Sequence, residues 1–351
     1  MSDSAPADSS QDEMDASSDS PYISVVVPIY NGEADVPALS KALLAQTYPA
    51  DRLEYLLVDN GSQDQTPNLL KAAIAEASTQ GKAATYLSET AIQSSYAARN
   101  CGIRAAQGEI LVFTDADCQP QPTWLEELVV PFADPAVGAV AGEIAALPGN
   151  NWLEQHAEQT NTLSQTHTLA HSFCPYGQTA NLAVRRSVFE QVGLFRPYLT
   201  TGGDADLCWR LQREGGWELR FAEQAIVRHR HRQTLAELQS QWRRYGKSNR
   251  YLHELHGIPL MRSISQSEIR YRLARWMIKE LPTVSYRVLA RKAPLIALVE
   301  TPLTLYCQVA RSAGQRQAQL PPEARQIAAI ADSADPLNKI PNASDKVEGA
   351  V

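Results

Sequence analysis

Short apolar runs alternate with helix-like segments over the first third of the chain. The apolar runs lie at residues 23–28, 53–58, 84–87 and 110–113. Apolar residues recur at helical spacing between them, over residues 36–44, 66–79 and 96–106. Such alternation is typical of a parallel sheet with helices packed on both of its faces. The pattern therefore predicts an α/β fold with a Rossmann-like, mostly parallel sheet.

The alternation changes after Pro122. The pattern predicts a helix over residues 122–132, a strand over residues 137–144 and a weakly amphipathic helix over residues 152–173. Basic helical segments follow to about residue 320. We therefore expect one α/β domain, followed by a helical C-terminal region. The predicted boundaries are residues 21–250 for the domain, with halves at 21–120 and 121–250, and residues 251–320 for the helical region.

The two ends of the chain differ in composition from the rest. Residues 1–20 carry six acidic residues, no basic residue and no apolar run, so they are expected to form a disordered acidic tail. This tail supplies most of the net charge of -7, which leaves the remainder near neutral. Residues 321–351 are also expected to be disordered. The five widely spaced cysteines argue against a disulfide framework or a zinc site and favour a reducing cytoplasm.

Two carboxylates follow the buried strand that ends at Phe113. Asp115 and Asp117 alternate in the sequence Thr-Asp-Ala-Asp, at the strand end where open α/β sheets bind ligands. Neighbouring carboxylates repel each other unless a cation or hydrogen-bond donors lie between them. A hard divalent metal that holds phosphate oxygens would explain the pair. The alternative is a structural turn whose Asp caps the helix at residues 122–132.

Polar turns also follow the first two strands, at residues 28–33 and 59–64. Such turns offer backbone N–H groups, an aromatic ring and carboxylates to a base and a ribose. The alternative for each is ordinary Asn-Gly turn chemistry. The first strand is not followed by G-x-G-x-x-G, and the chain contains no G-x-x-x-x-G-K-[ST], which disfavours a dinucleotide fold and a P-loop.

Six motifs together resemble the inverting family-two glycosyltransferases of GT-A fold, in the nucleotide-diphospho-sugar transferase superfamily. They are SVVVPIYN at 24–31, VDNGSQD at 58–64, ARNCG at 98–102, FTDAD at 113–117, NLAVRR at 181–186 and GDADL at 203–207. The resemblance implies a nucleotide-sugar-binding half, an acceptor half and a divalent metal, Mn²⁺ or Mg²⁺. It also implies transfer of one sugar with inversion from a nucleotide-diphospho-sugar, of which a UDP-sugar is favoured. Relatives of this kind build polysaccharides of the cell envelope.

The resemblance assigns roles to matching positions. Donor binding falls to Pro28, Tyr30, Asn31, Glu33, Asp59, Arg99 and Asp115. The metal ligands would be Asp117 and His229, with His231 as the second choice because it lies two residues further on the same strand face. The alternative for the sequence Arg-His-Arg-His-Arg at 228–232 is a solvated basic run.

Asp204 matches the catalytic base. A single inverting displacement needs a carboxylate that accepts the proton of the acceptor hydroxyl. The family usually has Glu-Asp here, whereas this chain has Gly203-Asp204, and Asp204 could also serve as a helix cap. Asp206 is expected to pair with Arg210 one helical turn away and so to orient the site. The missing Glu leaves a second hypothesis, a catalytically idle nucleotide-sugar-binding or scaffold protein.

The region after Arg228 is basic and contains interleaved aromatic residues. This composition suits an anionic membrane surface or a lipid-phosphate acceptor, and it predicts a cytoplasmic protein that is peripheral on the cytoplasmic face of the membrane. No nucleic-acid-binding motif is visible, so nucleic acid is disfavoured as a partner. The apolar segment at 294–306 is interrupted by Glu300 and Pro302, which favours a buried or interfacial helix over a membrane span.

Processive synthases of the family carry a Q-x-x-R-W signature. The sequence QSQWRR at 239–244 lacks it, so a non-processive enzyme is expected. The acceptor, a glycan or a lipid-linked sugar, would bind between residues 152–176 and the C-terminal helices.

Overall fold

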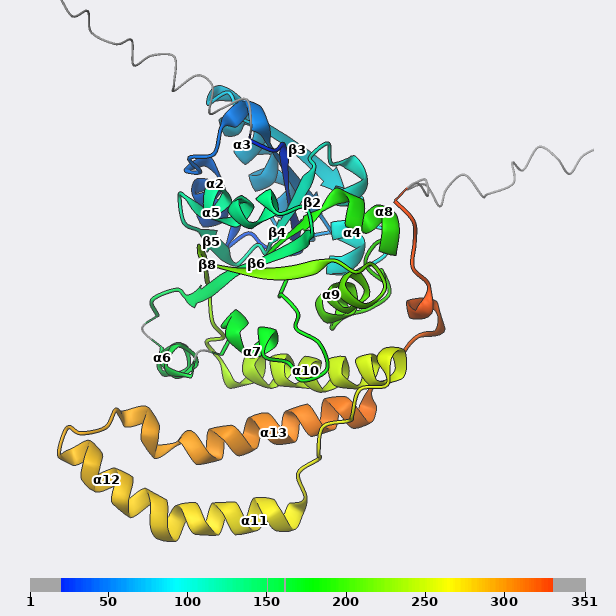
Figure 1. Cartoon of the computed structure of the whole chain (residues 1–351). Helices are drawn as coiled ribbons and strands as arrows, with labels where there is room; N and C mark the ends of the chain where they lie inside the picture. The colour runs from blue at the N-terminus through cyan, green and yellow to red at the C-terminus, as the bar shows by residue number, and fades with distance from the viewer. Residues whose placement is uncertain (1–19, 150, 161, 331–351) are drawn as a thin grey trace, which may run out of the picture.

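An eight-stranded sheet forms the centre of the molecule (Figure 1). The structure is a computed structural model that describes residues 20–149, 151–160 and 162–330. The tails predicted at residues 1–19 and 331–351 lie outside the described residues. The strands are β1 (Ile23–Ile29), β2 (Leu53–Asp59), β3 (Ala83–Ser88), β4 (Ile110–Thr114), β5 (Cys118–Pro120), β6 (Val137–Ala146), β7 (Asn181–Arg185) and β8 (Glu218–His229).

The sheet has a parallel half and a mixed half. Its strand order is β3-β2-β1-β4-β7-β6-β8-β5, and the first four strands are parallel. Strand β7 is antiparallel to both β4 and β6, β8 is parallel to β6, and β5 is antiparallel to β8. The predicted α/β fold is confirmed, and the parallel character is strongest in the first half.

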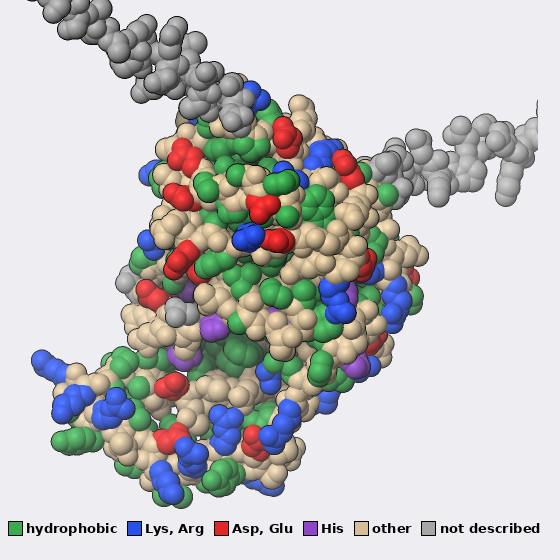
Figure 2. Space-filling model, viewed as in Figure 1, with side chains coloured by type: hydrophobic (Ala, Val, Ile, Leu, Met, Phe, Trp, Pro, Cys, Tyr) green, Lys and Arg blue, Asp and Glu red, His purple; other side chains and the backbone are tan. Residues whose placement is uncertain are grey.

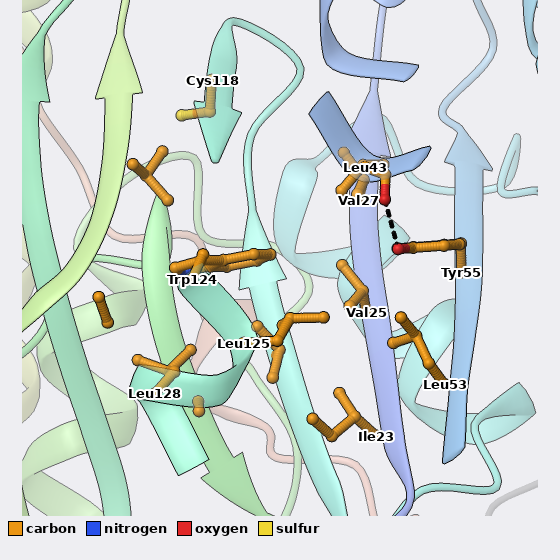
Figure 3. Close-up of a cluster of buried hydrophobic side chains, with 14 of the residues drawn as sticks. Ile23, Val25, Val27, Leu43, Leu53, Tyr55, Cys118, Trp124, Leu125 and Leu128 are labelled. Atoms are coloured by element: carbon orange, nitrogen blue, oxygen red, sulfur yellow. Dashed lines mark hydrogen bonds between the residues drawn. The ribbon is translucent and has the colours of Figure 1, made fainter. Parts of the chain in front are cut away.

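Both faces of the parallel half are covered by helices, which explains why β1, β2 and β4 are mostly apolar and fully buried. Strand β3, at the edge of the sheet, is only partly buried. All seven residues of β1 are buried. Val25 and Val27 contribute to the core on one face, and Val26 contributes to the core on the other. Figure 3 shows the first of these cores, where the Tyr55 hydroxyl donates to the Leu43 carbonyl at 2.5 Å.

The helices of the domain follow the predicted pattern with two differences. The helices are α2 (Val36–Leu44), α3 (Thr66–Thr79), α4 (Ser95–Ala105), α5 (Trp124–Val129), α6 (Trp152–Gln159), α7 (Gln165–Leu169), α8 (Arg186–Val192) and α9 (Gly203–Arg213). The helix expected at 122–132 is shorter and continues as a 3-10 turn to Ala133. The helix expected at 152–173 is two short helices, each with its own side-chain cap, from Asn151 and Ser164.

The C-terminal region consists of helices that lie beneath the domain in Figure 1. They are α10 (Leu235–His256), α11 (Gln266–Arg275), a π-helical turn (Trp276–Glu280), α12 (Leu281–Leu289) and α13 (Glu300–Gln317). Helices α10 and α13 approach closely at two glycines. A Cβ on Gly246 would lie 1.9 Å from the Arg311 carbonyl oxygen, and one on Gly314 would lie 2.1 Å from that of Arg243. Any side chain at either glycine would therefore separate the two helices.

The apolar segment at 294–306 forms a short 3-10 helix and the first turns of α13, with Ile296, Leu303 and Leu305 buried. No helix in the described part of the chain is long and apolar enough to span a membrane.

Residues 321–330 belong to the folded part of the chain, whereas the sequence analysis placed them in a disordered tail. Ala324 is fully buried in a 3-10 turn, and Ile330 packs on the same core. Arg196 donates to the carbonyls of Ala324 and Arg325. Few large apolar residues mark this segment, so the composition alone did not reveal that it packs on the domain.

Candidate active site

A cleft of about 500 Å³ opens at the carboxyl ends of β1 and β4 and at the end of β8. This is the edge of an open α/β sheet at which ligands bind. Residues from all parts of the domain meet there. Those predicted from the sequence that line the cleft are Pro28, Tyr30, Asn31, Arg99, Asp115, Asp117, Asp204 and His229.

Asp117 and His229 form a pair suited to a divalent metal. The Asp117 Oδ1 atom lies 3.2 Å from His229 Nε2, because β5 pairs with the end of β8 and places Cys118 opposite His229. Burial acts to raise the pKa of Asp117, but His229 and Arg232 lower it below its usual range, so the carboxylate is ionised. One carboxylate and one imidazole are ligands that Mn²⁺ and related ions accept.

The two neighbours of this pair are poorer ligands. The Cys118 sulfur lies within 4.8 Å of the Asp117 and His229 ligand atoms, but burial raises its pKa well above the usual thiol value and its side chain belongs to the core in Figure 3. His231, the second choice from the sequence, lines an adjacent cavity instead of the cleft. Strand β8 ends at His229, so the two-residue alternation that predicted a shared face stops before His231.

Arg99 and Asp115 form the next layer of the cleft. The Arg99 Nη2 atom lies 2.5 Å from Asp115 Oδ1, and the Arg99 side chain is only 3% exposed. Its Nε atom is buried without a hydrogen-bond partner among the described residues. A buried donor without a partner is costly, and the guanidinium of Arg99 lines the cleft beside Asp115.

Two predicted donor residues support the turns and do not line the cleft. Asp59 is 4% exposed and accepts hydrogen bonds from Ser62 N at 3.0 Å and the Tyr86 hydroxyl at 3.1 Å. Glu33 accepts from Gln65 N at 3.1 Å. These contacts shape the two turns that present Tyr30 and Asn31 to the cleft.

Asp204 lies in the first turn of α9 and is not its N-cap, which is Gly202. Its carboxylate accepts from the Thr179 hydroxyl at 3.1 Å and, at 3.4 Å, from the Thr179 N–H. Burial and the nearby Asp115 raise the pKa of Asp204, and Arg99 opposes the shift. A raised pKa brings a carboxylate closer to the range useful for a general base.

Tyr96 explains why glycine replaces the usual Glu at position 203. A Cβ on Gly203 would lie 2.7 Å from the Tyr96 ring, and the Gly203 N–H donates to the Tyr96 hydroxyl at 2.9 Å. The same hydroxyl hydrogen-bonds to Asp204. Tyr96 and Thr179 therefore position the candidate base. The sequence analysis missed both, because neither stands in a motif whose chemistry is visible from sequence.

Asp206 and Arg210 lie behind the cleft in a buried cluster. The Asp206 carboxylate is fully buried, and the predicted pair with Arg210 is present at 3.0 Å. Arg196 and His256 each approach Asp206 Oδ1 to 2.9 Å. Burial opposes ionisation, but these partners lower the pKa of Asp206 to about 2. The cluster holds α9 against the chain around it and so fixes the position of Asp204.

Basic residues line the other wall of the cleft. Arg230 donates to Asp35 at 2.8 Å, which explains why Asp35 makes no side-chain cap to α2 although it stands at the N-cap position. Arg232 lies 3.8 Å from Asp117. Arg244 lines the cleft with no carboxylate within ion-pair distance in the described part of the chain. The basic run at 228–232 is therefore part of the cleft and not merely solvated, and two of its arginines were not predicted as site residues.

Two family models and a relative of known class match this chain. The family model described as Glycosyl transferase family 2 matches residues 24–193, and that described as Glycosyl transferase family group 2 matches residues 110–310, more than half of the chain. Glycosyltransferase AglE of Haloferax volcanii is 32% identical over 259 residues, which cover 74% of this chain and 80% of AglE.

Two further similarities are more limited. An undecaprenyl-phosphate 4-deoxy-4-formamido-L-arabinose transferase of Pseudomonas aeruginosa is 33% identical over 124 residues, 34% of this chain and 36% of that protein. The structure of mannosyltransferase PcManGT from Pyrobaculum calidifontis in complex with GDP-Man and Mn²⁺ aligns with a TM-score of 0.58 at 20% identity. The alignment covers 85% of this chain and 87% of PcManGT, and it supports the fold. The chain belongs to glycosyl transferase family 2 and is a glycosyltransferase of GT-A fold.

Proposed function

We propose that this enzyme transfers one sugar, with inversion, from a nucleotide-diphospho-sugar to an acceptor hydroxyl in a metal-dependent, non-processive reaction. The observation that carries the proposal is that one cleft contains both the Asp117–His229 pair and the positioned carboxylate of Asp204. The first suits a metal at the diphosphate, and the second suits the removal of the acceptor proton. A scaffold protein would need neither.

One group of residues in the cleft would bind the donor diphosphate and its metal. Asp117 and His229 would hold the divalent metal, which when bound neutralises the negative charge that grows on the leaving diphosphate. Arg99, which lines the cleft, would bind the same phosphates through its guanidinium. Mannosyltransferase PcManGT was solved with GDP-Man and Mn²⁺, which supports a nucleotide-diphospho-sugar and a divalent ion here.

Asp204 performs the proton transfer. The acceptor oxygen forms a bond to the anomeric carbon while the bond from that carbon to the diphosphate breaks, and the nucleoside diphosphate leaves with the electron pair. The acceptor proton moves to the Asp204 carboxylate, which Thr179 and Tyr96 hold in place. Attack from the side away from the leaving group inverts the anomeric configuration.

The metal site is tested by replacing Asp117 with Ala. We expect the variant to lose the Mn²⁺- or Mg²⁺-dependent tightening of nucleoside-diphosphate binding, because the charged ligand is removed. The fold should remain, because the carboxylate is partly exposed and His229 can stay neutral. Calorimetric titrations of UDP and GDP with and without metal measure the effect.

His229→Ala should weaken the same coupling less, since it removes a neutral ligand. Asp51→Ala, which removes an exposed carboxylate away from the cleft, serves as the matched control. Equal metal dependence in Asp117→Ala and Asp51→Ala would show that Asp117 is not a ligand.

We further propose that residues 257–299, here named the basic segment, dock on an anionic membrane surface. The segment carries eight Arg or Lys and two Glu, and both Glu are already paired, with Arg262 and Arg275. It also holds nine of the 17 large hydrophobic residues that are exposed in the described part of the chain. They are Leu260, Met261, Tyr271, Met277, Ile278, Tyr286, Leu289, Leu295 and Val299.

The exposed apolar and basic side chains lie together. They gather at the lower end of the molecule in Figure 2, where α11 and α12 lie in Figure 1. None of the residues of α11, the π-helical turn and α12 is buried, and Ile278 in the turn and Leu289 in α12 are 72% and 84% exposed. A bilayer with acidic headgroups accepts apolar side chains and basic side chains at the same surface.

Binding to vesicles tests the membrane proposal. The protein should co-sediment with vesicles that contain phosphatidylglycerol, and the binding should weaken as salt rises, because exposed charges are screened within about 10 Å at 0.1 M ionic strength. Leu289→Asp and Arg287→Glu should each weaken it, while Lys41→Glu, on α2 of the domain, should not. Equal, salt-independent binding to neutral vesicles would indicate insertion instead, and no binding to either would contradict the proposal.

A further inference from the structure

Two further cavities lie next to the active-site cleft, and Tyr245 lines all three spaces. One has a volume of about 360 Å³ and shares Arg232, Gln241 and Tyr245 with the cleft. The other has a volume of about 720 Å³ and shares Gln178 and Tyr245 with it. Tyr245 lies on α10 (Leu235–His256), so both cavities adjoin the cleft at the wall that this helix forms.

The larger cavity has mostly apolar walls. Its wall includes Phe173, Tyr176, Trp242, Leu252, Ile258 and Leu260. Its volume falls within the range of pockets that enclose a small molecule, about 300–1,000 Å³. An apolar space of this size beside the cleft is unfavourable in water unless an apolar group fills it. It thus lies where part of an acceptor bound at Asp204 would extend.

Arg311 introduces a charge into this apolar space. It stands on α13 and lines both further cavities together with Trp242. Its side chain is half-buried, and no carboxylate lies within ion-pair distance of it in the part of the chain that the structure describes. A partly buried cation without a partner is costly, and guanidinium groups bind phosphates and carboxylates through paired hydrogen bonds.

We infer that these adjoining cavities bind an amphiphilic acceptor, with its apolar chain in the 720 Å³ cavity and its anionic group on Arg311. This inference rests on the proposed function, because it places the acceptor hydroxyl at Asp204. A free sugar would leave the apolar walls wet, and a plain hydrocarbon would leave Arg311 without a partner. An amphiphilic anion would cover the apolar walls with its chain and would pair its anionic group with Arg311.

The position of the cavity agrees with membrane docking. Leu260 and Met261 line it, and they are 40% and 46% exposed at the start of the basic segment. An amphiphile held in the bilayer could therefore enter the cavity from the surface that docks. The basic segment would bind the headgroups of the membrane, and the cavity would bind one molecule drawn from it.

Titration calorimetry with three probes tests the inference on the full chain. The probes are octyl phosphate below its micellar concentration, inorganic phosphate and octyl glucoside. Octyl phosphate should bind at least tenfold more tightly than either of the others, because only it offers both a chain and an anion. Arg311→Gln should weaken the binding of octyl phosphate at least tenfold and leave the binding of octyl glucoside unchanged. Arg316 is an exposed arginine on the same helix, and Arg316→Gln should change the binding of neither probe.

A second variant tests the chain site without altering the helix crossing at Arg311. Leu260→Asp, at the exposed mouth of the 720 Å³ cavity, should weaken the binding of both octyl phosphate and octyl glucoside. Metal-dependent binding of UDP or GDP should persist in every variant. If the unaltered protein shows no metal-dependent binding of UDP or GDP, the proposed function is overturned but the cavity site is not. The cavity inference is overturned if octyl phosphate binds no better than inorganic phosphate, or if Arg311→Gln and Arg316→Gln behave alike.

Discussion

Replacing Asp204 with Asn should reduce sugar transfer by about a hundredfold or more while the donor binds nearly as before. Asn keeps the size of the side chain and its hydrogen bond with Thr179, but it cannot accept the acceptor proton. The loss should therefore appear in kcat and not in donor affinity. Steady-state kinetics at saturating metal, together with donor titration, separates the two quantities.

The pH profile provides a second readout for Asp204. The base is active when deprotonated, and burial raises its pKa, so kcat/KM should fall as pH falls through a value above the ordinary aspartate range. Thr179→Val removes one hydrogen bond that favours the ionised carboxylate of Asp204. The acidic fall in kcat/KM should therefore move to higher pH in this variant. Full activity of Asp204→Asn on its acceptor would mean that another group is the base.

Asp206→Asn should instead lower the free energy of unfolding, by about 3–5 kcal/mol. The substitution leaves Arg196 and Arg210 in a buried site without the carboxylate that neutralises them. Because the partners of Asp206 lower its folded pKa to about 2, its contribution to stability is present above the unfolded pKa of about 4 and is lost as pH falls towards 2. Urea unfolding at neutral pH measures the difference.

Asp51→Asn is the matched control for this measurement, because Asp51 is exposed in a short 3-10 helix and should change stability by less than about 0.5 kcal/mol. A loss of less than about 1 kcal/mol in Asp206→Asn would mean that the ion-pair cluster contributes little. Transfer by Asp206→Asn should be measured only where the variant remains folded, since any loss could otherwise reflect unfolding of α9.

The first half of the fold was predictable because three of its four parallel strands, β1, β2 and β4, are fully buried and appear as mostly apolar runs. The fourth, β3, is a partly exposed edge strand with a shorter apolar run. The pairing of Asp117 with His229 was predicted only through the family resemblance. Nothing in the local sequence shows that β5 pairs with the end of β8 and so brings together residues far apart in the chain. Thr179 could not be predicted for the same reason, because its contact with Asp204 depends on the packing of a loop against α9.

Tertiary contacts also overrode several local signals. His231 lies beyond the end of β8 and lines an adjacent cavity, although its ring centroid is 6.1 Å from that of His229. Asp35 stands where a helix cap is expected, but its carboxylate binds Arg230 from the far end of the domain. Gly203 appeared as a missing carboxylate, whereas the Tyr96 ring fills the space a side chain would need. For Asp35 and Gly203 the deciding partner is distant in sequence.

Turnover of a panel of UDP-, GDP- and dTDP-sugars should be measured with and without Mn²⁺, because it reports sugar transfer and metal dependence together. One nucleoside diphosphate should be released in a reaction that stops with EDTA, resumes with added Mn²⁺ and is absent in Asp117→Ala. Transfer to a suitable acceptor should give a product of inverted anomeric configuration. Binding of a nucleotide-sugar without turnover, even with candidate acceptors present, would contradict the account and favour a scaffold protein.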